Sequence, residues 1–338
     1  MNTAGDSPVA AAAERLFSEL ADPRAGDASD EKGRKCLWDE VVRSGLSLAW
    51  TSEELGGSGA SVAEGFEIIH LSGRFALAVP LVETLLGGWL LSQGGLASPD
   101  GPMTVLPSRP GDRIQVDDSG AWSGRASFVS YAYDAAHFAV VGEAPQGPLV
   151  GLVAAADCSI IPGLSLNGTS CDTVELSNVL PVQFANCTDR SLARSMMLMG
   201  SVARALQMAG AMQSMLSLCI DYAGERRAFE RPISKFQAIQ HSLARLAPEA
   251  AVAMSAATSA ADAFANEAGA SDELLLEAAA AKIRCAEAVA KTCAMAHQIH
   301  GAIGFTEEYV LHRYTLGAMS WREDFGNEGY WALDLGNF

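Results

Sequence analysis

Three long stretches with apolar residues at helical spacing fill the second half of the 338-residue chain. They run Leu192–Ala223, Lys235–Asn266 and Asp272–His300. Ser271 is a favourable N-cap for the third stretch, and Asp272 and Glu273 follow in its first turn, where acidic groups stabilise a helix. Because helices this long with connections this short favour antiparallel packing, the pattern predicts a helical bundle.

Five methionines follow one another along the first of these stretches: Met196, Met199, Met208, Met212 and Met215. The flexible methionine side chain fills irregular gaps in cores and at subunit contacts. We therefore interpret this stripe as core or subunit interface, not as a ligand-binding surface.

The first half of the chain has two further textures. From Val9 to Gln93 apolar residues again fall at helical spacing, with glycine breaks near Gly56, which predicts a small helical domain. Between residues 94 and 189 short apolar runs are cut by Pro, Gly and Asp, which is typical of a compact antiparallel β-domain. The predicted domains are residues 1–93, 94–189 and 190–338, and the predicted fold class is α+β, mainly α.

Composition excludes several classes of partner. The formal net charge of -17 disfavours a nucleic acid or an anionic lipid surface. The seven cysteines form no CxxC pair, which suits reduced thiols. The N-terminal residues lack the basic start of a signal peptide, and no uncharged apolar stretch of about 18 residues suggests a membrane span. We therefore expect a cytoplasmic protein with no membrane or nucleic-acid partner.

A cluster of basic residues separates the first two long helical stretches. The segment contains Arg226, Arg227, Phe229, Arg231, Pro232, Lys235, Phe236 and Gln237. Arginine guanidinium groups match phosphate oxygens, an aromatic ring can cover an adenine, and a helix N-terminus favours an anion. The segment is therefore either a site for the phosphates of a dinucleotide or of CoA, or a solvated charged turn.

The third helical stretch ends in small residues. Gln298 and His300 are followed by Gly301, Ala302 and Gly304, which would let a ligand approach the backbone closely. The alternative is an ordinary glycine C-cap. His297, His300 and His312 lack the spacing and the carboxylate partner of a metal site, so no metal is expected.

Together the two segments resemble the acyl-CoA dehydrogenase family. The family pattern is R-x-x-F-G-x-P-[IL] with F-Q, followed much later by Q-x-x-G-G-x-G-[FY]. The matching residues are Arg226, Phe229, Pro232, Ile233, Phe236, Gln237, Gln298, Gly301, Gly304 and Phe305. Glu230 and Ala302 replace expected glycines. Trp38, Gly45-Leu46 and the run 53–59 (EELGGSG) resemble the family's N-terminal pattern as well.

The resemblance implies an N-terminal helical domain, a reduced central antiparallel β-domain and a C-terminal four-helix bundle. It also implies FAD, which family members bind across a subunit interface, with an acyl-CoA substrate. The residues that would hold the adenine side of a neighbour's FAD are Arg226, Phe229, Phe236, Gln237, Gln298, His300, Gly301 and Ala302.

The flavin-ring half and the catalytic base do not match the family. The stretch 104–112 is shorter than the family's T-E-P-x-[AG]-G-S-D loop and keeps almost none of it, while Ser130 stands where a flavin-side hydroxyl is expected. The family's reaction needs a carboxylate that removes the α-proton. Its two alternative positions correspond to Phe325 and Gly200 here, and neither is a carboxylate.

Three readings follow. The chain is a non-catalytic subunit of a hetero-oligomeric acyl-CoA dehydrogenase, plausibly α2β2 with a catalytic sibling, and the resemblance implies a bulky steroid-CoA substrate. Alternatively, it is a self-sufficient enzyme that uses Glu323, Asp324 or Glu328 as base, although these three are also explained as surface charges around Trp321. The third reading is a structural or regulatory protein that keeps the fold without flavin chemistry.

Overall fold

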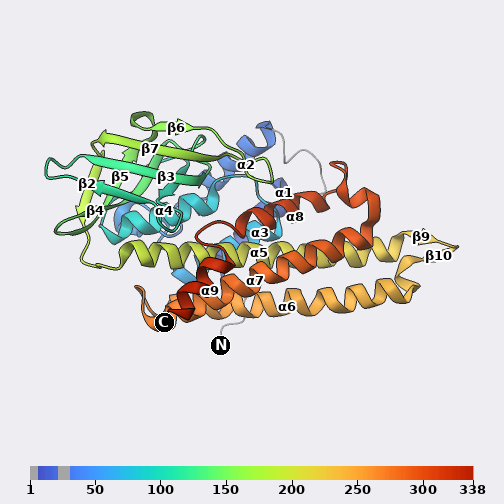
Figure 1. Cartoon of the computed structure of the whole chain (residues 1–338). Helices are drawn as coiled ribbons and strands as arrows, with labels where there is room; N and C mark the ends of the chain where they lie inside the picture. Colours follow the sequence, from blue (N-terminus) through green and yellow to red (C-terminus); the bar gives the residue numbers. More distant parts are fainter. Residues whose placement is uncertain (1–6, 22–30, 338) are drawn as a thin grey trace.

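The computed structural model describes residues 7–21 and 31–337 (Figure 1). The N-terminal part is helical, with α1 (Pro8–Leu20), α2 (Glu31–Arg43), α3 (Val62–Arg74) and α4 (Leu81–Gln93). The strands are β1 (Met103–Leu106), β2 (Arg113–Val116), β3 (Trp122–Ser130), β4 (His137–Ala144), β5 (Gly147–Ala154), β6 (Ser159–Ile161), β7 (Cys171–Val179) and β8 (Gln183–Asn186). The C-terminal part comprises α5 (Leu192–Glu225), β9 (Arg227–Ala228), β10 (Arg231–Pro232), α6 (Gln237–Asn266), α7 (Asp272–His300), α8 (Leu311–Trp321) and α9 (Glu328–Gly336).

The sheet is mixed, which corrects the prediction of an antiparallel β-domain. Its strand order is β6-β7-β3-β2-β4-β5-β8, and β1 pairs with β4. Most neighbours are antiparallel, but β1 and β2 each run parallel to β4. Parallel pairing needs a long connection between the two strands, and the chain between β1 and β4, which includes β2 and β3, supplies one.

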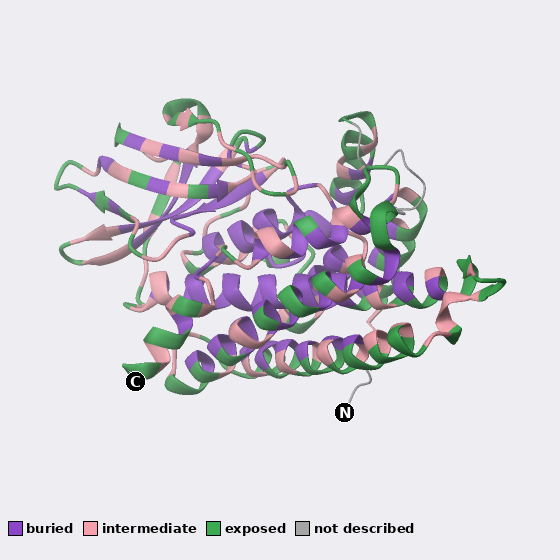
Figure 2. Cartoon of the chain, turned by 45° about the vertical axis from the view of Figure 1, so that its right-hand side comes forward, coloured by how far each residue is buried: buried purple, intermediate pink, exposed green. Residues whose placement is uncertain are grey.

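The long helices α5, α6 and α7 pack side by side and carry the C-terminal part of the molecule (Figure 1). Ser271 caps α7 by accepting from the Leu274 amide, as the sequence predicted. The central part of α5 is buried almost all round because α3, α6, α7 and α8 surround it (Figure 2). All five methionines of the α5 stripe are buried, so the stripe belongs to the core of the chain.

Helices α3 and α5 approach each other closely, which fixes the N-terminal helices against the bundle. A Cβ atom added at Gly73 would lie 2.6 Å from the Gln207 Cα, a separation that packed atoms do not adopt. Glycine at position 73 therefore allows backbone-to-backbone contact at this crossing. The same crossing places Ser72 of α3 beside Gln207, whose side-chain amide donates to the Ser72 hydroxyl at 3.1 Å.

Candidate functional site

The two segments that the sequence singled out meet at one end of the bundle. The end of α5, the start of α6 and the end of α7 lie there, away from the sheet (Figure 1). The Tyr222 hydroxyl on α5 donates to the backbone carbonyl of His300 on α7 at 3.2 Å. The Tyr222 and His300 rings also stack, with centroids 4.5 Å apart. We call the exposed residues around this junction, Arg226 to Gln237 and Gln298 to Ala302, the bundle-end surface.

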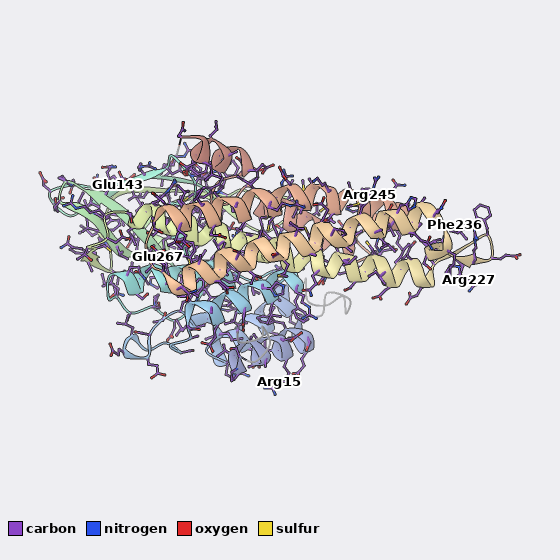
Figure 3. All side chains as sticks on the ribbon, turned by 90° about the horizontal axis from the view of Figure 1, so that it is seen from below. Arg15, Glu143, Arg227, Phe236, Arg245 and Glu267 are labelled. Carbon is purple, nitrogen blue, oxygen red and sulfur yellow. The ribbon has the colours of Figure 1, made fainter. Side chains whose placement is uncertain are left out.

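A small hairpin projects from this end (Figures 1 and 3). Strands β9 and β10 pair antiparallel and are joined by the two residues Phe229 and Glu230. Both have positive φ, 50° and 67°, as a tight type I′ turn requires. The Phe229 side chain is 90% exposed at the tip. The hairpin therefore presents an aromatic ring that is largely exposed to solvent.

Replacing Glu230 by Gly is expected to stabilise the protein by about 1 kcal/mol. A residue with a Cβ atom is less stable at positive φ by about that amount, whereas glycine adopts positive φ without steric strain. Urea unfolding of the two proteins measures the difference. The matched control is Ala228→Gly, at a position without positive φ, which should be neutral or slightly destabilising. Equal effects of the two substitutions would contradict the assignment of strain to position 230.

The bundle-end surface combines positive charge with aromatic rings. The Arg231 guanidinium lies 4.2 Å from the centre of the Phe236 ring, and Phe229 contacts the same ring edge-to-face at 6.2 Å. Figure 3 shows Arg227 and Phe236 together at this end. Within the described parts of the chain, the exposed Arg226 guanidinium forms no hydrogen bond or ion pair. Helix α6 begins next to it without a side-chain cap, so its first amides are open to an anion.

The end of α7 contributes exposed backbone and one buried side chain. Gln298, Gly301 and Ala302 are exposed. His300, predicted as a cofactor-binding residue, is only 4% exposed. Its Nδ1 donates to the Ala296 carbonyl at 2.8 Å and its Nε2 accepts from the Tyr309 hydroxyl at 3.1 Å. Burial lowers the pKa of His300, which favours a neutral ring packed inside the chain, and the contact of this residue with a cofactor stays a prediction.

The two positions at which the resemblance places a catalytic base, Gly200 and Phe325, are in contact in the middle of the molecule. A Cβ atom added at Gly200 on α5 would overlap the Phe325 ring, with the Cε1 atom at 2.5 Å. Phe325 follows α8 in a turn with φ of 53° and is 2% exposed. One phenyl ring therefore fills the point shared by both positions, and no group there can accept a proton.

A buried group of charges lies beside that ring. Arg204 is one turn along α5 from Gly200, and its guanidinium forms ion pairs with Glu83 at 2.5 Å and with Asp324 at 2.9 Å. It lies 5.8 Å from the centre of the Phe325 ring. Burial opposes the charge of Arg204, but Glu83 and Asp324 outweigh it and raise the pKa. We call Arg204, Glu83 and Asp324 the arginine cluster.

The arginine cluster bears on the three alternative bases. Asp324 accepts hydrogen bonds from Arg204 and, at 3.3 Å, from the Ser130 hydroxyl, so it is not the surface charge that the sequence suggested. Glu328 is ion-paired with Arg322. Burial raises the pKa of Glu328, but the hydrogen bond from its own backbone amide and the contact with Arg322 lower it by more, so the pKa is lowered overall. Glu323 is exposed, as expected for a surface charge, and accepts from the Asn327 amide at 3.2 Å.

The loop in place of the family's flavin-side loop contacts the neighbouring strand β3 through a side chain. Within the stretch 104–112, Arg109 lies with its guanidinium 4.0 Å from the centre of the Phe128 ring. Phe128 stands two residues before Ser130 on β3, and Ser130 is bonded to Asp324. The hydroxyl expected to face a flavin is therefore already paired within the chain.

A buried lysine holds the turn that carries Phe325. The Lys282 ammonium on α7 is fully buried and donates to the backbone carbonyls of Trp321, at 3.0 Å, and of Asp324. These carbonyls belong to the end of α8 and the turn after it, which have no helical partner of their own. Burial lowers the pKa of Lys282 to about 7. Lys282 is therefore an internal C-cap.

This shift predicts an unusual dependence of stability on pH. Between about pH 7 and the ordinary lysine value, the unfolded chain binds a proton at position 282 that the folded chain lacks, so the free energy of unfolding rises with pH. Compared with Lys282→Met, the wild type should gain up to about 1.4 kcal/mol per pH unit between pH 7.5 and 9.5. Urea unfolding across that range measures both slopes, and parallel slopes would contradict the lowered pKa.

Across residues 7–21 and 31–337, none of the helices is both long and apolar enough to cross a membrane. In the same part of the chain, His, Cys, Asp and Glu side chains do not gather in threes at a point that could hold a metal ion.

Comparison with known proteins points in one direction. Residues 191–330 match the family model described as "Acyl-CoA dehydrogenase, C-terminal domain". The chain is 26% identical over 325 residues to the acyl-CoA dehydrogenase FadE27 of Mycobacterium tuberculosis, covering 86% of this chain and 84% of that protein.

Solved structures share the fold over the whole chain. The ChsE4-ChsE5 complex from Mycobacterium tuberculosis has a TM-score of 0.86 at 22% identity and covers 100% of this chain and 97% of its own. A steroid ACAD variant, Tcur3481-Tcur3483, has a TM-score of 0.84 at 23% identity, covering 97% and 96%. An acyl-CoA dehydrogenase complexed with FAD from Bacillus anthracis has a TM-score of 0.80 at 19% identity, covering 97% and 67%.

Proposed function

We propose that the chain is a non-catalytic subunit of the acyl-CoA dehydrogenase family that holds the adenine side of an FAD bound by a catalytic partner. The predicted fold class is confirmed by the solved structures. The observation that carries the proposal is the contact between Gly200 and Phe325, because both positions for a base are occupied by groups without a carboxylate. The reaction would be the α,β-dehydrogenation of an acyl-CoA thioester.

The bundle-end surface fits one end of FAD. Arg226 has no partner of its own in the described residues and offers a guanidinium to a phosphate oxygen. The open first turn of α6, beginning at Gln237, adds amides for the same anion. Phe229 and Phe236 offer ring faces to an adenine, while Gln298 and the exposed Gly301-Ala302 backbone offer hydrogen bonds. FAD, when bound, supplies the acceptor for the substrate hydride.

The contacts within the chain argue against the self-sufficient enzyme. Asp324 is held by Arg204 and Glu328 by Arg322, so neither carboxylate is free to take an α-proton, and Glu323 is on the surface. The guanidinium of Arg109 lies over one face of the Phe128 ring, near the expected flavin side. A partner subunit would therefore supply the base, the flavin-ring pocket and the acyl pocket.

The assembly we propose is an α2β2 heterotetramer acting on a bulky steroid-type acyl-CoA. The support is similarity: one structure with the same fold is a complex of two different proteins, and another is a steroid ACAD. Both share less than a quarter of their residues with this chain, so the substrate class is carried by analogy of fold.

The experiment is co-expression with a candidate catalytic sibling, followed by measurement of FAD content from the flavin absorbance of the purified complex. Arg226→Ala is expected to weaken FAD retention about tenfold or more, because a charge-assisted hydrogen bond to phosphate is lost. Arg15→Ala, an exposed arginine on α1 far from the hairpin (Figure 3), is the matched control and should leave FAD content unchanged.

Two outcomes would overturn the proposal. Full FAD occupancy with dehydrogenase turnover by the chain alone would make it a self-sufficient enzyme. A stable complex without any flavin absorbance would favour a structural or regulatory role.

A further inference from the structure

A cavity of about 860 Å³ has none of the residues of the bundle-end surface in its lining. It is enclosed by α2, the connection 75–80 after α3, the connection 166–170 before β7, and α8. Its volume lies within the range of small-molecule sites in proteins. Neither Gly200 nor Phe325 lines it, and the arginine cluster does not line it either.

The walls of this cavity are part apolar and part polar, and the apolar part comes from core side chains. Leu37, Leu77, Val79 and Trp321 contribute side chains that are otherwise buried in the core. Leu316 on α8 lines the cavity while 38% of it remains exposed. An apolar ligand body placed here would cover hydrocarbon surface that the chain leaves in contact with water, which favours binding.

The charged residues of the cavity differ in balance from the rest of the chain. Three basic side chains line it, Arg34, Lys35 and Arg313, against two acidic ones, Asp134 and Glu307. The whole chain carries a net charge of -17, so a region with more basic than acidic groups stands out. In a low-dielectric cleft a local excess of positive charge concentrates anions. An acidic head group is therefore the complementary ligand feature.

Tyr131 separates the cavity from the arginine cluster. Its backbone has a positive φ of 57°, and its side chain lines the cavity while its hydroxyl contacts Thr169. The same hydroxyl is close enough to Glu83 and Arg204 for both to shift its pKa. A ligand in the cavity would lie on the other side of this side chain from Phe325, so it would be remote from the position of the missing base.

We propose that this cavity binds an amphipathic anion, with the apolar body against Leu37, Leu316 and Trp321 and the acidic head at Lys35 and Arg313. The site is separate from the bundle-end surface and goes beyond the proposed function. No covalent chemistry is assigned to it. It would let the subunit hold a carboxylate-bearing chain or ring system.

The test uses dodecanoate as the probe, with dodecyltrimethylammonium and dodecyl maltoside as matched cationic and neutral probes, all below their micelle concentrations. Calorimetry gives the affinities, and the fluorescence of Trp38 and Trp321, which both line the cavity, reports the place of binding. Dodecanoate is expected to bind at least about tenfold more tightly than the cationic probe. Equal affinities of the three probes would overturn the proposal.

Two variants locate the site. Gly317→Leu fills the cavity from α8; a Cβ there would first meet Trp321 at 3.4 Å, an ordinary contact, so the fold should tolerate it. It should abolish dodecanoate binding. Lys35→Gln should weaken binding about two- to fivefold, while Lys32→Gln, one turn away on α2 and outside the lining, should not.

Thermal unfolding of each variant verifies that it is folded. Unchanged dodecanoate affinity in a folded Gly317→Leu protein would overturn the proposal. FAD retention by the complex is the second readout, because within this chain it depends on the bundle-end surface and not on the cavity. Arg226→Ala is expected to lose FAD and to keep its dodecanoate binding. If this variant retains FAD, the proposed function fails and the cavity proposal does not. If the Gly317→Leu protein binds dodecanoate unchanged, the cavity proposal fails and the proposed function does not.

Discussion

Replacement of Arg204 by Met is expected to lower the free energy of unfolding by about 3–5 kcal/mol. The substitution keeps the volume of the side chain but leaves Glu83, which is buried on α4, without its partner, and an unpaired buried charge is costly. It also releases Asp324 from α5, so the turn that carries Phe325 loses one of its attachments and keeps those to Lys282 and Ser130. Urea unfolding at pH 7 measures the effect.

The control for this prediction is a second substitution in the same cluster. In the double variant Glu83→Gln with Arg204→Met no buried carboxylate remains unpaired at position 83, so part of the loss should be recovered. Arg113→Met removes an exposed partner of Glu143, with more than half of the Arg113 side chain in solvent, and should cost less than about 1 kcal/mol. A similar loss in Arg113→Met and Arg204→Met would contradict the importance of burial.

The second large effect is expected at Gly200. Replacing it by Ala places a methyl group on the Phe325 ring, and Phe325 has no free space to move into because it is buried and held by a turn. Overpacking of this kind costs about 1–3 kcal/mol or more. Unfolding of Gly200→Ala by urea or heat gives the loss.

A double-mutant cycle assigns that cost to one contact. Phe325→Ala alone should destabilise by about 3–5 kcal/mol, because it leaves a cavity beside Gly200. In that background Gly200→Ala should be neutral or stabilising, since the new methyl group enters the vacated space and improves the helix propensity of α5. Additive losses in the double variant would show that the two residues do not compete for the same volume.

Much of the fold was predictable because helical periodicity is a local signal. The third long stretch was predicted from Asp272 to His300 and has those bounds in the structure, with Ser271 as its cap. The convergence of Arg226 and Gln298 at one end of the bundle follows once three long helices alternate in direction. The parallel pairing of β1 with β4 was missed because strand direction depends on partners distant in sequence.

The chemistry of the interior was harder to predict. Arg204 and Lys282 interrupt runs of apolar and small residues in α5 and α7, and these interruptions were the available signal for buried charges. The sequence around such a charge does not show which residue pairs with it. Glu83 lies 121 residues from Arg204 along the chain. The burial of the His300 ring was not predicted, because a motif fixes which residues are present, whereas the helix rotation decides which of them face solvent.

The contact between Gly200 and Phe325 makes the order of evolutionary change matter. A carboxylate cannot enter at position 200 while the phenyl ring is present, so the ring would have to be replaced first. Unless that first change itself introduces a carboxylate at position 325, it lowers stability without yielding a base, and selection for stability removes such intermediates. The contact between the two residues therefore makes position 325, and not position 200, the place where a single substitution could introduce a carboxylate.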